Sequence, residues 1–298
     1  MFTKSTEPVP HWRTFLLRVS KESAISLAVF LVLLVACTAG GYWLLFRLGR
    51  ATPVMLSVGV ATILTCLIRK KDLATLGWGW GNWQYQWLSY LLPLAIASVA
   101  YLIIWITGWG GWYNTGFILE QIQGYNLPGW SSAGIIVFHF LLTASFSFIL
   151  LLPSVLGEEI GWRGFLVPEL AKFMSFTHVA LVSGLIWSVW HWPMMFKGFY
   201  GNDVTPLYYQ LFFFTLLIVS YSVIMTYLRL KTDSLWTAVI FHMSANVFLQ
   251  KFFTPLTIEN ESSAWYMNEF GAVPALVAFA FAIFFWIKGK SEFGDLSR

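Results

Sequence analysis

Long apolar runs recur along the whole chain and most constrain how it can fold. An α-helix rises about 1.5 Å per residue, so about 20 consecutive apolar residues are enough to cross a bilayer. Only 11% of the residues are charged, whereas an ordinary soluble domain has about a quarter. The sequence therefore predicts an all-α fold, a polytopic transmembrane helical bundle. About eight candidate spans are visible, at residues 24–46, 53–68, 87–107, 133–156, 177–196, 207–228, 234–250 and 270–287.

Basic residues are unevenly distributed between the two sets of loops that these spans create. Cytoplasmic loops of membrane proteins are enriched in Lys and Arg. The distribution of Lys and Arg agrees with this rule when both termini are in the cytoplasm and the loops at 108–130 and 251–269 are outside. The compact single-domain form favours a bacterial plasma membrane. In this orientation only four of the 18 Lys and Arg residues lie outside: Arg47, Arg50, Lys197 and Lys251.

Several other functions are not supported by the composition. The net charge of +4 does not indicate nucleic-acid binding, because the basic residues lie in short loops rather than in a stripe with interleaved aromatics. Cys37 and Cys66 both fall in apolar segments and form neither a disulfide framework nor a zinc spacing. The Leu34–Cys37 segment resembles a lipoprotein cleavage box. The apolar run continues to Phe46, beyond the roughly 7–15 residues of a signal segment, which favours an uncleaved span.

Two adjacent carboxylates, Glu158 and Glu159, stand beside an apolar run. A charged residue inside a membrane is costly and is by default a functional hypothesis. Arg163 follows Glu159 by four residues, so a helix places the two on one face, where they neutralise each other. A packing role explains that pair but leaves Glu158 unexplained. A buried carboxylate of this kind suits a general base that takes a proton from water.

Two further apolar segments each carry a histidine. His191 stands between Trp190 and Trp192, and taken alone it is more typical of a packed or interfacial residue. His242 and Asn246 are four residues apart and share a helix face, so both can donate to a developing oxyanion. Hydrogen bonding between helices explains that pair equally well. Counted from the cytoplasmic starts of their spans, His191 lies roughly 20 Å deep and His242 roughly 12 Å, so their depths disagree.

Together, Glu-Glu-x-x-x-Arg, aromatic-x-x-x-His and His-x-x-x-Asn, in this order, resemble the signature of the CPBP family. These are the CAAX-protease and bacteriocin-processing intramembrane proteins, which include Ras-converting endopeptidases. The first motif continues to Pro168, and the family usually has Phe at the position of Trp187, so we expect packing to shift and chemistry to survive. One integral membrane domain is expected, comprising N-terminal spans (1–132), a CPBP-like catalytic core (133–250) and a C-terminal span with a cytoplasmic tail (251–298).

The resemblance implies a glutamyl-type intramembrane endopeptidase that cuts a membrane-associated protein or peptide without a covalent intermediate. Its general base would be Glu158, and His191 would help to hold the attacking water. The oxyanion hole would be formed by His242 and Asn246. The peptide would enter a cavity open to the membrane or the cytosol. The motif helix would be oriented by Glu159 and Arg163.

Metal dependence and two other functions remain as alternatives. The family includes proteins described as metalloproteases and as metal-independent, so zinc bound by Glu158, His191 and His242 is the alternative to a cofactor-free site. We favour the cofactor-free site, because the chain has no helix-borne pair of histidines. A non-catalytic scaffold or bacteriocin-immunity protein would not need the intact motif. A proton-coupled transporter would use Glu158 and Glu159 to carry protons and Arg163 as a gate. Such proteins commonly show inverted repeats, and we find no such symmetry in the sequence.

Overall fold

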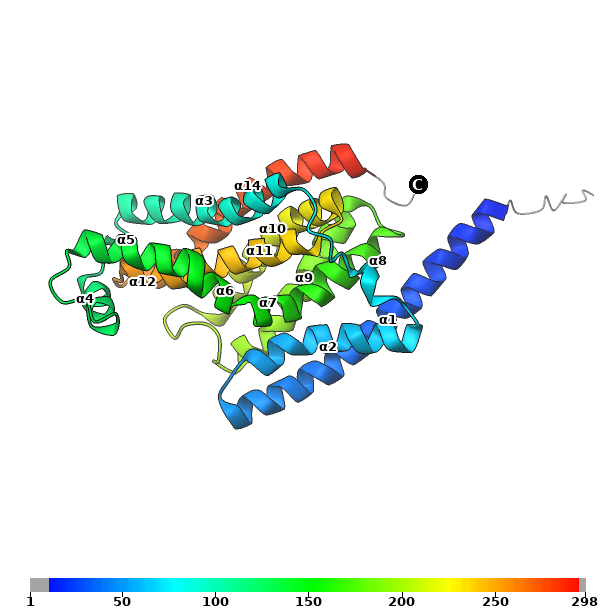
Figure 1. Cartoon of the computed structure of the whole chain (residues 1–298), viewed down its shortest axis with the longest axis horizontal. Helices are drawn as coiled ribbons and strands as arrows, with labels where there is room; N and C mark the ends of the chain where they lie inside the picture. The colour runs from blue at the N-terminus through cyan, green and yellow to red at the C-terminus, as the bar shows by residue number, and fades with distance from the viewer. Residues whose placement is uncertain (1–10, 295–298) are drawn as a thin grey trace, which may run out of the picture.

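The structure, a computed structural model, describes residues 11–294, with side chains described from residue 21 onward. This part of the chain is almost entirely helical, which confirms the predicted all-α class (Figure 1). The only strands in it, β1 (Gly111–Trp112) and β2 (Thr257–Ile258), form one short antiparallel pair. The α-helices are α1 (His11–Leu48), α2 (Thr52–Arg69), α3 (Trp83–Thr107), α4 (Thr115–Gly124), α5 (Ser132–Leu142), α6 (Phe148–Leu150), α7 (Leu152–Glu159), α8 (Val167–Ala171), α9 (Phe176–Phe196), α10 (Leu207–Thr232), α11 (Leu235–Ala245), α12 (Thr254–Leu256), α13 (Ser263–Tyr266) and α14 (Ala272–Phe293).

Four further helical segments complete the path of the chain. A 3₁₀ turn, η1 (Leu73–Leu76), precedes α3. The other three are π-helical, and π-helical turns are frequent at functional sites. They follow α5, α7 and α11 directly and so widen the helix at those points. These segments are η2 (Thr143–Ser147), η3 (Ile160–Leu166) and η4 (Asn246–Phe253).

Seven helical stretches of the described chain are long and apolar enough to cross a membrane. They match seven of the predicted spans, and the remaining prediction, 234–250, corresponds to α11 and the first part of η4. That α-helix has only 11 residues, and all of them except Trp236 are buried. A helix that is apolar on every side belongs in the centre of a bundle. The seven stretches are Lys21–Leu48, Thr52–Arg69, Trp83–Thr107, Ser132–Leu150, Phe176–Phe196, Leu207–Thr232 and Ala272–Phe293.

The outer surface of these helices is apolar. Val32, Val35 and Ile106 are 70%, 71% and 83% exposed, and many other large apolar side chains around the bundle are exposed as well. A soluble monomer rarely presents a continuous apolar surface of this kind, whereas lipid is a suitable solvent for it. The protein is therefore an integral, multi-pass membrane protein.

Glycines bring the helix of the two carboxylates against α2. A Cβ atom built on Gly59 would lie 2.7 Å from the carbonyl oxygen of Gly157, and one on Gly161 would lie 2.5 Å from Val58 Cγ1. Small residues spaced by four along a helix allow two backbones to approach closely in a membrane. Gly157 and Gly161 therefore hold one face of α7 and η3 against α2. The side chains of Glu158 and Glu159 project elsewhere, into the bundle.

The turn between α10 and α11 sets where α11 begins. Asp233 has a left-handed backbone (φ 53°), and its carboxylate lies 2.5 Å from Nη1 of Arg229. Ser234 caps α11 by accepting a hydrogen bond from the Trp236 amide, and the Leu235 amide donates to the Gly77 carbonyl. These bonds attach the start of α11 to the segment between η1 and α3. The position of His242 in the bundle follows from this attachment.

Candidate active site

A cavity of about 160 Å³ lies in the bundle, and four of the six predicted site residues line it. Most of its wall is apolar or aromatic. A mostly apolar cavity with a few convergent polar groups is the usual form of a site for a small molecule or a peptide segment. The two predicted residues that do not line it, Glu159 and Arg163, are buried directly behind the wall. The four that line it are Glu158, His191, His242 and Asn246.

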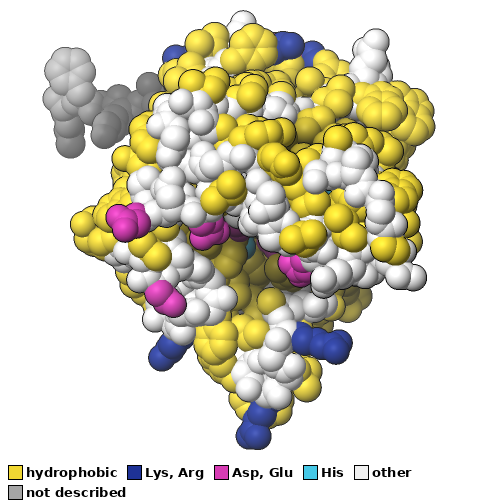
Figure 2. All heavy atoms as spheres, turned by 90° about the vertical axis from the view of Figure 1, so that its left-hand side faces the viewer, with side chains coloured by type: hydrophobic (Ala, Val, Ile, Leu, Met, Phe, Trp, Pro, Cys, Tyr) yellow, Lys and Arg dark blue, Asp and Glu magenta, His cyan; other side chains and the backbone are white. Residues whose placement is uncertain are grey.

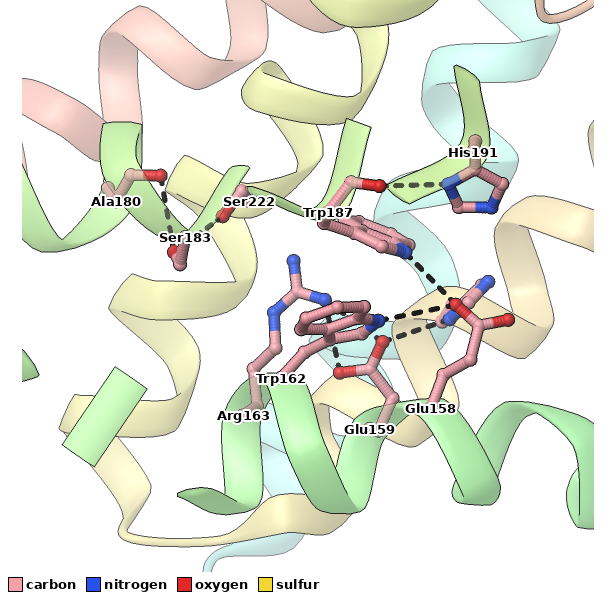
Figure 3. Close-up of polar contacts among 10 residues, drawn as sticks. Glu158, Glu159, Trp162, Arg163, Ala180, Ser183, Trp187, His191 and Ser222 are labelled. Atoms are coloured by element: carbon pink, nitrogen blue, oxygen red, sulfur yellow. Dashed lines mark hydrogen bonds and ion pairs between the residues drawn. The ribbon is translucent and has the colours of Figure 1, made fainter. Parts of the chain in front are cut away.

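Glu158 is the penultimate residue of α7, and two tryptophans hold one of its oxygens (Figure 3). Oε2 accepts hydrogen bonds from Nε1 of Trp187 at 3.0 Å and from Nε1 of Trp162 at 3.4 Å. The side chain is 2% exposed. Among the described residues the other oxygen, Oε1, has no hydrogen-bond partner, and it is not sealed in the protein. One oxygen is thus fixed, and the other is left to act in the cavity.

Glu159 follows Glu158 on the same helix and is fully buried. Its carboxylate lies 3.0 and 3.2 Å from Nη1 of Arg163, so the structure contains the ion pair expected from their spacing. Oε1 also lies 2.9 Å from Nδ1 of His242, a contact between residues 83 positions apart. A buried carboxylate is stable only when it is paired and hydrogen-bonded. Glu159 therefore has two partners, one on its own helix and one on α11.

The hydrogen bonds of the two histidines define their protonated nitrogens. His191 Nδ1 lies 2.9 Å from the carbonyl oxygen of Trp187, which can only accept, so Nδ1 carries the hydrogen. The neutral ring then presents Nε2 as an acceptor. His242 Nδ1 likewise donates to the carboxylate of Glu159. Its Nε2 is an acceptor in the neutral ring and a donor only in the imidazolium form.

Trp187 contributes a hydrogen bond to the site as well as the aromatic packing expected from the sequence. A phenylalanine at this position has no N–H and cannot make the hydrogen bond to Glu158. The guanidinium of Arg163 lies 4.2 Å from the centre of the indole ring, within the range of a cation–π interaction. The substitution of Trp for the usual Phe therefore adds a polar contact to the site as well as volume.

Three polar side chains of the cavity wall that contact one another, Gln250, Tyr200 and Glu269, were not predicted. Gln250 follows Asn246 by four residues, and this continued i, i+4 spacing was a signal that could have identified it. Tyr200 and Glu269 lie in loops, after α9 and before α14, where no periodicity marks them. Glu269 accepts hydrogen bonds from the other two. All three line the cavity with the predicted residues.

The cavity lies toward one end of the bundle. Its wall includes Ala51 between α1 and α2, Tyr200 after α9 and Glu269 before α14. These loops belong to the end that also carries α4 and α12 (Figure 1). Figure 2 views the molecule from that end and shows acidic side chains around a hollow. The mouth of the cavity is therefore opposite the end that carries Lys71 and Lys172.

The donors do not form a metal centre. Within residues 11–294, no three side chains of His, Cys, Asp or Glu are grouped closely enough to hold a metal ion. This includes the trio considered for zinc, Glu158, His191 and His242. Nδ1 of each histidine donates to a protein acceptor, which leaves Nε2 as the ring nitrogen that could bind a metal. As they are placed, these three side chains do not come together around one ion.

Comparison with known proteins identifies the segment that carries these residues. A family model described as Type II CAAX prenyl endopeptidase Rce1-like matches residues 140–248. A protein of Methanococcus maripaludis named CAAX prenyl protease 2 is 35% identical over 104 residues. That alignment covers 34% of this chain and 38% of the relative, so the chain spans well under half of the relative's length. Residues 140–248, which carry Glu158, His191, His242 and Asn246, are therefore similar to the CAAX proteases of the CPBP family.

Proposed function

We propose that the protein is an intramembrane endopeptidase that hydrolyses a peptide bond in a membrane-associated protein or peptide. The single observation that carries the proposal is the state of Glu158. One of its oxygens is held by two indoles, and the other is free at the wall of an apolar cavity that also contains His191, His242 and Asn246. A pure packing role gives no reason to leave a buried carboxylate oxygen without a protein partner.

Hydrolysis then proceeds by direct attack of water. Oε1 of Glu158 takes a proton from a water molecule whose other hydrogen is accepted by Nε2 of His191. The water oxygen bonds to the carbonyl carbon, and the oxyanion accepts hydrogen bonds from the Asn246 amide and from Nε2 of protonated His242. Glu158 returns the proton to the leaving nitrogen as the C–N bond breaks. No covalent intermediate and no metal are needed.

Glu159 has a defined part in this scheme. Its carboxylate accepts the Nδ1 hydrogen of His242 and so orients the ring with Nε2 toward the oxyanion. Arg163 compensates the charge of Glu159 from the other side at 3.0 Å. The pair therefore acts on the chemistry through His242 as well as on the packing of the motif helix.

We propose that the cavity opens on the outer side of the membrane, and the distribution of basic residues supports this orientation. At the end of the bundle where the cavity opens, Arg47, Arg50, Lys197 and Lys251 are the basic residues, whereas Arg69, Lys70, Lys71, Lys172 and Lys231 lie at the other end. The positive-inside rule makes the second end cytoplasmic. Both termini, residues 1–10 and 295–298, lie outside the described part, and we propose that they are cytoplasmic. The peptide then enters from the outer face of what we take to be a bacterial plasma membrane, not from the cytosol.

The decisive experiment compares peptide termini in membranes of a strain that lacks the protein. The strain is complemented with the native chain or with Glu158→Gln, which keeps the size of the side chain and removes the base. We expect new termini only with the native chain, and we expect them to persist when a chelator is added to washed membranes. Identical termini from both chains, with restored phenotype, would support a scaffold or immunity protein. Loss of cleavage with the chelator, restored by zinc, would contradict the metal-free mechanism.

A further inference from the structure

A hydrogen-bonded chain of side chains runs from the mouth of the cavity to Asn246. Oε1 of Glu269 accepts the hydroxyl hydrogen of Tyr200 and lies 2.8 Å from Nε2 of Gln250. The same Gln250 nitrogen lies 3.3 Å from Oδ1 of Asn246. Glu269, Tyr200 and Gln250 all line the cavity. None of the three belongs to the motifs that carry the family resemblance.

The backbone holds Glu269 firmly in place. The residue before it, Asn268, has a left-handed conformation (φ 59°), and its side chain accepts the Phe270 amide at 2.9 Å. The Asn268 amide lies 3.3 Å from the hydroxyl of Tyr101, a buried residue of α3. The carboxylate is therefore supported by neighbours on both sides. It is not a mobile surface group.

The chain of hydrogen bonds has a fixed direction. Oε1 of Glu269 accepts two hydrogen bonds, so Gln250 must turn its NH₂ group toward it. That NH₂ group also donates to Asn246, which must therefore present its carbonyl oxygen, Oδ1, to Gln250. The amide nitrogen of Asn246 is left facing away from Gln250, and it has no hydrogen-bond partner among the described residues. An amide nitrogen free at the cavity wall is the donor that an oxyanion requires.

We propose that Glu269 is a positioning residue that acts through Gln250 to hold the Asn246 amide with its N–H₂ toward the reacting carbonyl. This inference rests on the proposed function and assigns a part of the site to a loop outside the matched segment. Without the carboxylate, Gln250 and Asn246 can both rotate their amides by 180°. The carbonyl oxygen of Asn246 then faces the cavity, where it repels an oxyanion.

The kinetic test uses Glu269→Gln, which keeps size but can donate as well as accept, and Gln250→Met, which removes the link. The probe is a fluorogenic peptide spanning the cleavage site found in the membrane comparison. Loss of an oxyanion donor costs about 10²–10³ in kcat, so we expect about a ten-fold fall in kcat for each variant, with KM unchanged. In an Asn246→Ala background, Glu269→Gln should produce no further fall. Glu261→Gln, an exposed carboxylate of the same segment, serves as the matched control.

A second measurement does not depend on activity. The melting temperatures of Glu269→Gln, Asn246→Ala and the double variant are compared in detergent. Residues in one hydrogen-bond network show coupled effects, whereas independent residues add. We expect the shift of the double variant to be smaller than the sum of the single shifts. Additive shifts, or unchanged kcat in both Glu269→Gln and Gln250→Met, would overturn the proposal. Cleavage that survives Glu158→Gln would instead overturn the endopeptidase mechanism, and the melting experiment would still test the network.

Discussion

Trp187 alone contacts four of the other candidate site residues. Its indole N–H donates to Glu158, its ring lies against the Arg163 guanidinium, and its centre is 5.1 Å from the ring of His242. Its carbonyl accepts the hydrogen of His191 Nδ1. A hydrogen bond to a charged group is worth about 1.5–3 kcal/mol. Trp187 therefore fixes the positions of Glu158 and His191.

We expect Trp187→Phe to slow cleavage about ten-fold or more, because one hydrogen bond that fixes Glu158 is lost. The comparison is with Trp192→Phe, on the same helix, whose indole nitrogen has no partner among the described residues. Initial rates with a peptide that spans the cleavage site provide the measurement. Equal rates for the two variants would mean that the N–H of Trp187 does not position the base.

The position of α7 and η3, the segment that carries Glu158 and Glu159, depends on its contact with α2. A Cβ on Gly161 would lie 2.5 Å from Val58 Cγ1 and 3.1 Å from the Val58 carbonyl oxygen, and the backbone atom cannot move aside. Overpacking of this kind costs about 1–3 kcal/mol. We therefore expect Gly161→Ala to lower the melting temperature and to reduce cleavage by moving Glu158. Gly164→Ala, in the same π-helical segment with its nearest atom at 3.4 Å, should change neither. A neutral Gly161→Ala would contradict the close approach of the two helices.

A second element, α8, is tied by Glu169 to two lysines at the basic end of the bundle. Burial alone would raise the pKa of the Glu169 carboxyl, but hydrogen bonds from Lys172 and Lys71, each 2.7 Å from Oε1, outweigh it and hold that pKa below its usual value. A lowered pKa in the folded state stabilises the protein above the pKa of the unfolded chain, about 4.3. The stabilisation is lost as the pH falls through the folded-state value.

We therefore expect Glu169→Gln to reduce the free energy of unfolding by about 1 kcal/mol at neutral pH, since both lysines are partly exposed and screened. The difference from the native protein should shrink as the pH falls below about 4.3 and should disappear once Glu169 is protonated in the folded state. Thermal melts in detergent across this range measure it. Glu259→Gln, which removes an exposed carboxylate at the other end, should be neutral throughout. A constant difference at all pH values would show that the ion pairs contribute nothing.

The whole molecule has two electrically different ends, and the cavity opens at the end with few basic residues. Single cysteines in a chain without Cys37 and Cys66 report which side each end faces. We expect a membrane-impermeant thiol reagent to label Phe199→Cys, at the cavity wall, on intact cells. It should label Ala74→Cys, exposed in η1 at the other end, only after the membrane is broken. The reverse pattern would place the cavity on the cytosolic side.

The sequence by itself determined the membrane-embedded all-α class, seven of the spans, the Glu159–Arg163 pair and the family motifs. Each of these depends on neighbours along one helix or on hydropathy, which local spacing records. Only the tertiary structure joined Glu159 to His242 and Trp187 to Glu158, across 83 and 29 positions of the chain. It also brought His191 and His242 to the wall of one cavity, although their depths counted along the sequence disagree. The role of Glu269 could not be predicted from the sequence, because a loop side chain acquires its partners only when distant helices pack together.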